Sequence, residues 1–234
     1  MGRIAGKVIS IFILVIISFT ANAQKYWELG GMAGGAYYLG DINHSKQFYH
    51  FNPAGGGFLR YSFTQRWQAR IALNAGYLSG DDKDFANKFQ QLRAHSFSTP
   101  IVETSGTIEF NFKPFKLEDR KKFFSPYVFT GGTFLIASNA SNPYQIAIPM
   151  GVGLKLNFLK LFTFGVEWGF RKTFTDGLDK LTWDKTLPFT QLTDEYQLPK
   201  QTGYYRQKDW YSMVLVSLSF KLYSYDKACH TYDF

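Results

Sequence analysis

The chain has 234 residues, a formal net charge of +8 and one cysteine, and 19% of its residues are aromatic. This length suits one domain, and a lone cysteine excludes an internal disulfide framework. The excess of positive charge is modest and is spread over predicted turns and loops, without a basic helix or an aromatic nucleic-acid motif, which argues against nucleic-acid binding.

The N-terminus predicts a secretory signal peptide over residues 1–23. Arg3 and Lys7 precede an apolar run from Val8 to Phe19, and Ala21-Asn22-Ala23 supplies the small residues of a cleavage site. A membrane anchor is the alternative, but about 20 apolar residues are needed to span a bilayer and this run is shorter. No later segment resembles a membrane helix, so any membrane residence must be as a barrel.

The remaining chain alternates between apolar and polar residues, which is typical of β-strands. In chain order, strands are predicted over Tyr26–Leu39, Ala54–Phe63, Trp67–Ser79, Ile101–Phe112, Pro126–Ala137, a hairpin of two strands within Gln145–Lys172, and Lys208–Leu222. Pro126–Ala137 is apolar on both faces, so its pattern does not orient it. Gly80–Phe97 is predicted to be a long loop, and a solvated loop is the expected state of its acidic stretch Asp81–Asp84.

The hairpin shows the pattern most clearly. Every second residue from Ile146 to Phe158 and from Phe162 to Phe170 is apolar, and the alternate positions are small or polar. Isolated charges among glycines on the polar wall suit a lumen, and this dyad repeat is the signature of a transmembrane β-barrel. The predicted fold class is therefore all-β: an eight-stranded antiparallel transmembrane β-barrel of outer-membrane type over residues 24–222, followed by a tail over 223–234.

Loop lengths give the barrel a direction. The connections 1–2, 3–4, 5–6 and 7–8 are the longer ones on average, whereas 2–3 and 6–7 are tight and 4–5 is intermediate. Outer-membrane barrels keep long loops outside and short turns in the periplasm, so both termini are expected in the periplasm. Aromatic residues at the predicted strand ends match interfacial girdles: Trp27, Phe63, Trp67, Phe112, Phe158 and Phe162 at one rim, and Tyr37, Tyr77 and Trp210 at the other. A soluble lipocalin-like barrel, the alternative, would place its apolar residues inside.

Charged residues are predicted to close the lumen. An eight-stranded barrel is just wide enough inside for side chains to fill it. The inward charges are four acids and four bases: Glu28, Glu103, Glu109, Glu167, Arg60, Arg70, Lys155 and Arg171. Because an unpaired buried charge costs several kcal/mol, a paired network is expected, with Glu167 and Arg171 as members of the paired set. The prediction is a plug, not a charged pore or a proton path.

Catalysis is not expected. The four histidines fall in loops and the tail without the spacing of metal ligands, and no serine occupies a nucleophile elbow. Cys229 has only the neighbouring His230 as a candidate base. No cofactor is implied. A barrel enzyme with a triad of rim residues far apart in the sequence remains an alternative.

Three stretches together resemble a known family. They are Glu28–Ile42 (ELGGMAGGAYYLGDI), Gly165–Asp179 (GVEWGFRKTFTDGLD) and the segment DWYSMVL that begins at Asp209. They resemble the PorG-like outer-membrane barrels of the type IX secretion system of Bacteroidota. Related barrels carry Thr-Asp-Tyr-Leu-Asp-Asp after the seventh strand. This chain has Gly177 in place of the tyrosine and Lys180 in place of the last aspartate. No role of that last aspartate in cation binding or packing therefore carries over.

The resemblance implies a non-enzymatic barrel associated with a periplasmic ring of a lipoprotein and its partner subunit, supporting protein export. The alternatives are a free-standing OmpX-like surface or adhesion barrel and a lipid-modifying enzyme. Outer-membrane lipid is an expected partner in each case. An unpaired thiol tends to be oxidised in the periplasm, so Cys229 is expected to form an intermolecular disulfide, most readily with the ring lipoprotein. The alternative is an unreactive thiol in the tail or a reduced one under the rim of the barrel. The basic connector, Arg120, Lys121 and Lys122, is a second candidate docking point.

Overall fold

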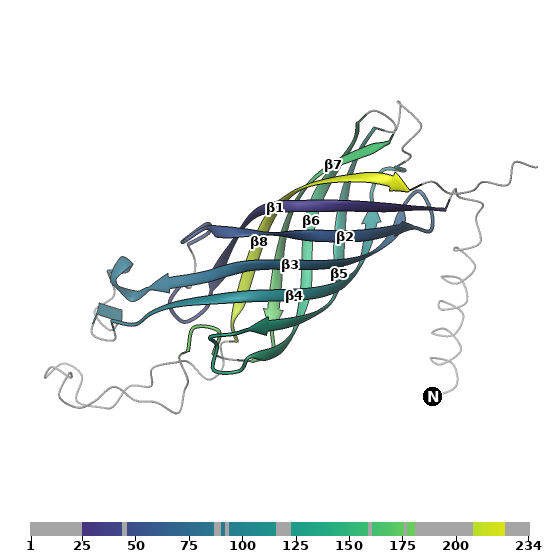
Figure 1. Ribbon diagram of the computed structural model, residues 1–234. Coiled ribbons are helices and arrows are strands. Elements are labelled where there is room, and N and C mark those ends of the chain that lie inside the picture. Colours follow the sequence, from purple (N-terminus) through teal and green to yellow (C-terminus); the bar gives the residue numbers. More distant parts are fainter. Residues whose placement is uncertain are drawn as a thin grey trace, which may run out of the picture.

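The computed structural model describes residues 25–43, 46–86, 90–91, 94–115, 123–158, 161–175, 177–180 and 208–222. In this part of the chain the strands are β1 (Tyr26–Leu39), β2 (Asn52–Ser62), β3 (Trp67–Asp81), β4 (Ser96–Asn111), β5 (Phe124–Ala137), β6 (Tyr144–Phe158), β7 (Phe162–Thr173) and β8 (Trp210–Leu222), with a 3₁₀ helix, η2 (Asp82–Asp84). Each strand pairs with the next and β8 pairs with β1, which closes the barrel, and all pairs are antiparallel. Figure 1 shows the tilted strands, with the start of β1 and the end of β8 at the same end of the barrel.

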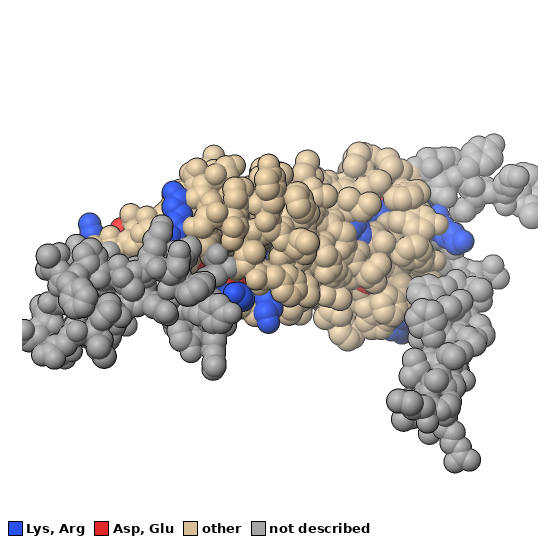
Figure 2. All heavy atoms as spheres, turned by 90° about the horizontal axis from the view of Figure 1, so that it is seen from below, with Lys and Arg blue, Asp and Glu red and all other residues tan. Residues whose placement is uncertain are grey.

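The two-residue period separates the side chains into an inner and an outer set. On the outer wall Ile71 is 63% exposed and Ile146 is 62% exposed, whereas Glu28 on the inner wall is fully buried. In the face shown in Figure 2, the middle of the barrel is almost free of charged side chains, and Lys and Arg lie toward its ends. An apolar exterior around a polar interior inverts the arrangement of a soluble barrel, so the lipocalin-like alternative does not fit.

The connection between β3 and β4 is shorter than the sequence predicted. The ladder continues to the pair Asp81↔Ser96, so β4 begins five residues before the predicted Ile101. Backbone pairing needs no apolar alternation, and these polar strand ends therefore looked like loop. The expected solvation of Asp81–Asp84 is wrong for Asp82, which is fully buried and accepts the backbone N–H of His95 at 3.0 Å.

The structure orients β5, whose pattern was ambiguous. Tyr127, Phe129 and Leu135 point inward and are buried, while Phe134 and Ile136 are exposed on the outer wall. The inward rings cover cationic side chains: Lys155 Nζ lies 4.1 Å from the centre of the Tyr127 ring. Aromatic residues on the inner face therefore fill the lumen and offer cation–π contacts.

Most of the predicted aromatic girdle faces outward. Trp27, Trp67 and Phe112 are between 39% and 52% exposed at the end where β1 begins, and Tyr77 is 51% exposed toward the other end. Tyr37 is the exception, since it is fully buried. The loop after β1 folds back over it: the Phe48 ring lies 5.4 Å from Tyr37 and stacks on Trp168 at 5.8 Å.

Candidate functional site

The lumen is filled by a network of ion pairs centred on Glu109. Its carboxylate contacts Arg60 Nε at 3.1 Å, Arg70 Nε at 3.0 Å and Lys155 Nζ at 2.5 Å. The three cations come from β2, β3 and β6, and Glu109 comes from β4. Three positive charges around one carboxylate need further acids to compensate them. The structure supplies these on β1 and β7.

The remaining charges of this network are compensated by Glu28 and Glu167. Arg60 Nη1 donates to Glu28 at 2.8 Å, and Arg70 Nη1 donates to Glu167 at 2.5 Å. Arg70 on β3 and Glu167 on β7 belong to strands that are not neighbours, so this pair crosses the lumen. The Tyr127 hydroxyl also donates to Glu167, at 2.8 Å.

A second cluster surrounds Glu103. Arg171 Nη2 lies 3.2 Å from its carboxylate, the Asn74 amide donates to it at 3.0 Å and the Tyr211 hydroxyl donates to it at 2.6 Å. Glu167 and Arg171 both belong to the buried ion-pair network, and their ion-pair partners are Arg70 and Glu103. Residues four apart on one strand are separated by about 13 Å along it, so each reaches across the lumen instead.

All eight charges predicted for the lumen lie inside the barrel, and none is more than 4% exposed. The network consists of Glu28, Arg60, Arg70, Glu103, Glu109, Lys155, Glu167 and Arg171, and we call it the lumen network. The rings of Phe58 and Phe129 pack against its guanidinium groups, with Arg60 4.7 Å and Arg70 5.3 Å from the respective ring centres. Charged groups and rings together occupy the space that a water-filled channel would need.

A short segment closes the mouth at the end of the barrel with the longer connections. Residues Gly177–Lys180, which we call the latch, follow β7 and turn inward. Leu178 is fully buried in the apolar core. Its carbonyl accepts from Thr99 Oγ1 at 3.1 Å, and the carbonyl of Asp179 contacts His95 Nε2 at 2.7 Å. Gly177 has a φ of 124°, a conformation that favours glycine.

Two aspartates tie the latch to the strands. Asp209, next to β8, accepts the backbone N–H groups of Gly177 and Leu178 through Oδ2 at 2.8 and 2.7 Å. The Tyr38 hydroxyl lies 2.5 Å from Asp209 Oδ1 and 2.8 Å from Asp179 Oδ2. Burial raises the pKa of Asp209 to about 6, against the lowering effect of these hydrogen bonds. Sequence reasoning missed this group, although its acids lie in two of the stretches that carry the family resemblance.

The predicted docking residues lie outside the described part of the chain. Cys229, Arg120, Lys121 and Lys122 belong to this set, as do the predicted signal peptide over 1–23 and the tail over 223–234. Their roles stay predictions.

Among the described residues, no cluster of three or more His, Cys, Asp or Glu side chains could hold a metal ion. Within the same residues, no helix is long and apolar enough to cross a membrane.

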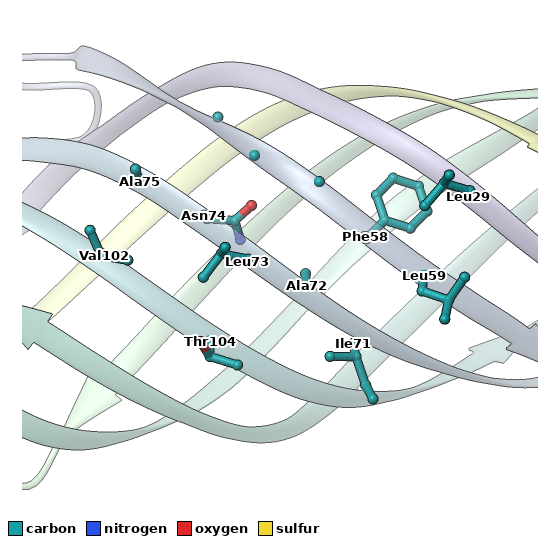
Figure 3. Close-up of a pocket in the computed structure, with 13 residues that line it drawn as sticks. Leu29, Phe58, Leu59, Ile71, Ala72, Leu73, Asn74, Ala75, Val102 and Thr104 are labelled. Atoms are coloured by element: carbon teal, nitrogen blue, oxygen red, sulfur yellow. The ribbon is translucent and has the colours of Figure 1, made fainter.

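The outer wall carries a shallow apolar hollow over β1 to β4, with a volume of about 660 Å³. Its floor includes Gly55 and Gly57, and its walls include Leu29, Leu59 and Ile71, whose side chains Figure 3 shows beside the strands. The missing side chains of the two glycines leave the depression between larger aliphatic neighbours. Apart from Asn74 and Thr104 its lining is apolar, and the lining contains no acid, base or histidine.

A closed antiparallel barrel with an apolar outer wall and a charged, filled interior is an eight-stranded transmembrane β-barrel of the outer-membrane type, which confirms the predicted fold class. The chain belongs to the family described as domain of unknown function DUF6089, whose model matches residues 6–232.

Solved structures similar to this chain are bacterial barrels of low sequence identity. Neisserial surface protein A (NspA) is 9% identical with a TM-score of 0.48, over 85% of this chain and 99% of that one. The N-terminal barrel domain of Pseudomonas aeruginosa OprF is 13% identical with a TM-score of 0.43, over 85% and 100%. Pseudomonas aeruginosa OprG is 10% identical with a TM-score of 0.43, over 86% and 99%. No curated protein matches the sequence.

Proposed function

We propose that this protein is a non-enzymatic outer-membrane barrel that anchors a periplasmic complex of the type IX secretion machinery and does not conduct solutes. The observation that carries the proposal is the lumen network. Ion pairs such as Arg70–Glu167 join strands across the barrel, and every member is buried. A barrel whose interior is occupied acts through its outer wall, its loops and its termini.

The outer wall supports residence in a membrane. Leu73, Val152 and Leu218 are each more than half exposed at mid-strand positions, which in water would form an extended apolar surface. Lipid covers such a surface without penalty, and the aromatic side chains at the strand ends suit the interface with the headgroups. The secretory signal peptide predicted over residues 1–23 would direct the chain toward the outer membrane.

Docking is assigned to the end where β1 starts and β8 finishes. The resemblance to PorG-like barrels supports a ring lipoprotein and its partner subunit as the bound proteins. Cys229 would form an intermolecular disulfide there, because the periplasm is oxidising and the chain has no second cysteine. The basic side chains of Arg120, Lys121 and Lys122 would add charge-dependent contacts.

A pull-down of the full chain from membranes, with and without reducing agent, tests this proposal. Recovery of a periplasmic lipoprotein in a high-mass band that collapses on reduction, and that disappears with Cys229→Ser, supports disulfide docking. If Cys229→Ser leaves both the band and secretion unchanged, the cysteine has no docking role.

Deleting 223–234 separates the three classes of function. We expect loss of protein secretion with adhesion and lipid A composition unchanged. Loss of adhesion alone would favour a surface barrel, and altered lipid A would favour an enzyme. Either of these results contradicts the secretion role. The deletion variant must retain the heat-dependent gel mobility of a folded barrel for the comparison to be valid.

A further inference from the structure

The hydroxyl group of Tyr38 lies between two carboxyl groups at the mouth of the barrel. Its distances to Asp209 Oδ1 and Asp179 Oδ2 are 2.5 and 2.8 Å. Tyr38 is fully buried, and so is Asp179, while Asp209 is 1% exposed. Both contacts are short enough for hydrogen bonds between oxygen atoms.

A count of protons shows what these contacts require. A tyrosine hydroxyl has one proton to donate and two lone pairs. One lone pair accepts the backbone N–H of Asp41 at 3.1 Å. The single O–H can donate to only one carboxylate, so the other contact is a hydrogen bond only when that carboxyl group carries a proton and donates it to the phenol oxygen. With both acids ionised, one contact would bring a carboxylate against an oxygen without a proton between them.

The two acids hold the latch in place. Asp209 accepts two of its backbone N–H groups, and Asp179 is itself part of the latch. The backbone N–H of Ser141, in the connection between β5 and β6, donates to Gly177 at 3.0 Å. Repulsion between Asp179 and Asp209 would therefore act on the contact that seats Leu178 in the mouth.

We propose that Gly177–Lys180 is a pH-sensitive latch, closed by a proton that Asp179 and Asp209 share through Tyr38 and loosened when this proton leaves. The proton belongs to the pair of acids, not to either residue alone. Loss of the proton leaves two negatively charged carboxylates against one phenol hydroxyl. The latch relieves their repulsion by moving Asp179 away from the mouth.

The other ionisable groups at the mouth set the charge around the pair. Asp41 lies close enough to Asp209 to raise its pKa further, adding to the effect of burial. His95 touches the backbone of Asp179 through Nε2, and its own backbone N–H donates to Asp82. Lys180 and Lys208 adjoin the two acids in the chain. The mouth thus combines four acids with one imidazole and two amines. Because the His95 ring contacts the latch, the experiment includes a His95 variant as a control.

The direction of the pH effect follows from the raised pKa. Burial holds the pKa of Asp209 at about 6 in the closed mouth, compared with 3.8 for an ordinary aspartate. The closed mouth therefore binds a proton more tightly than the open one, so closure is favoured at low pH and weakens as pH rises through about 6. A two-unit difference predicts that opening becomes about tenfold easier between about pH 5 and about pH 7.5.

Hydrogen–deuterium exchange of the full chain, folded in detergent micelles, measures latch opening. Exposure times are scaled so that the product of exposure time and intrinsic exchange rate is the same at about pH 5 and about pH 7.5. The amides of Gly177 and Leu178 should lose about tenfold in protection at the higher pH. Equal protection at the two values would overturn the proposal.

Substitutions identify the titrating pair. Asp179→Asn supplies a permanent N–H donor to Tyr38, so protection should persist at both pH values and the tenfold change should vanish. Tyr38→Phe removes the bridge and should lower protection at the acid pH. His95→Gln and Asp84→Asn, an acid of the β3–β4 connection outside this contact, should keep the tenfold change. Three results would each refute the shared proton. The first two are loss of the tenfold pH difference in His95→Gln and its retention in Asp179→Asn. The third is protection that millimolar calcium restores at the higher pH.

Discussion

At the scale of single residues, the barrel depends on the satisfaction of buried charges. Arg171 and Glu103 form the clearest pair, because Arg171 donates through Nη2 to Glu103 and through Nη1 to the carbonyl of Gly169. We predict that Arg171→Met destabilises the barrel by about 3–5 kcal/mol, because it leaves the Glu103 carboxylate buried without its cation. The double variant Arg171→Met/Glu103→Gln should be less destabilised, since both charges are gone.

Urea titration of the folded barrel in lipid vesicles measures both effects. Simple addition of the two single-variant losses in the double variant would mean that these groups are solvated. Such a result would also contradict the burial of the lumen network.

Glycines on the two faces of β1 make a matched pair. A Cβ on Gly34 would lie 2.0 Å from the carbonyl oxygen of Val214, whereas a Cβ on Gly31 would meet no atom closer than 3.8 Å. Gly34→Ala should therefore destabilise the barrel by about 1–3 kcal/mol through overpacking. Gly31→Ala should be neutral or stabilise by about 0.4–1 kcal/mol, because the unfolded chain loses freedom. Equal losses in the same urea titration would show that the inner and outer faces are misassigned.

At the scale of elements, the sequence predicted all eight strands that the structure describes, and two of them, β1 and β3, begin at the predicted residue. It could not predict the extension of β4 to Ser96, because backbone pairing continues where side chains are polar. Nor could it orient β5, whose inner face carries rings that cover cations. Pairings such as Arg70–Glu167 depend on which strands face each other across the lumen, information that no local pattern contains.

The lipid-facing side of β6 gives a prediction that depends on depth. Val152 lies at the middle of the strand and is 54% exposed, and Ile146 lies near its start and is 62% exposed. Val152→Lys should cost about 2–4 kcal/mol, because a charge at the bilayer midplane is poorly solvated, and Ile146→Lys only about 0–1 kcal/mol. The free energy of unfolding in vesicles measures the difference. A smaller loss for Val152→Lys than for Ile146→Lys would place the membrane elsewhere.

At the scale of the whole molecule, closure of the barrel by the β1–β8 pair makes the fold resistant to detergent. The thirteen paired positions from Trp27↔Leu222 to Leu39↔Trp210 leave no open edge on either strand. We predict that the unboiled protein migrates faster than the boiled protein in detergent gels, because the closed barrel stays compact. Identical mobility before and after boiling, or recovery of the protein from the soluble periplasm, would count against a membrane barrel.

The filled lumen is the central claim, and planar-bilayer recording tests it most directly. The purified barrel is inserted into a lipid bilayer alongside a known open porin as a positive control. Because the lumen network and its aromatic neighbours occupy the interior, we predict no steady conductance above the baseline of the membrane at any voltage the bilayer tolerates. A large, steady conductance from the wild-type barrel would contradict the plug and, with it, the proposed role as a closed anchor.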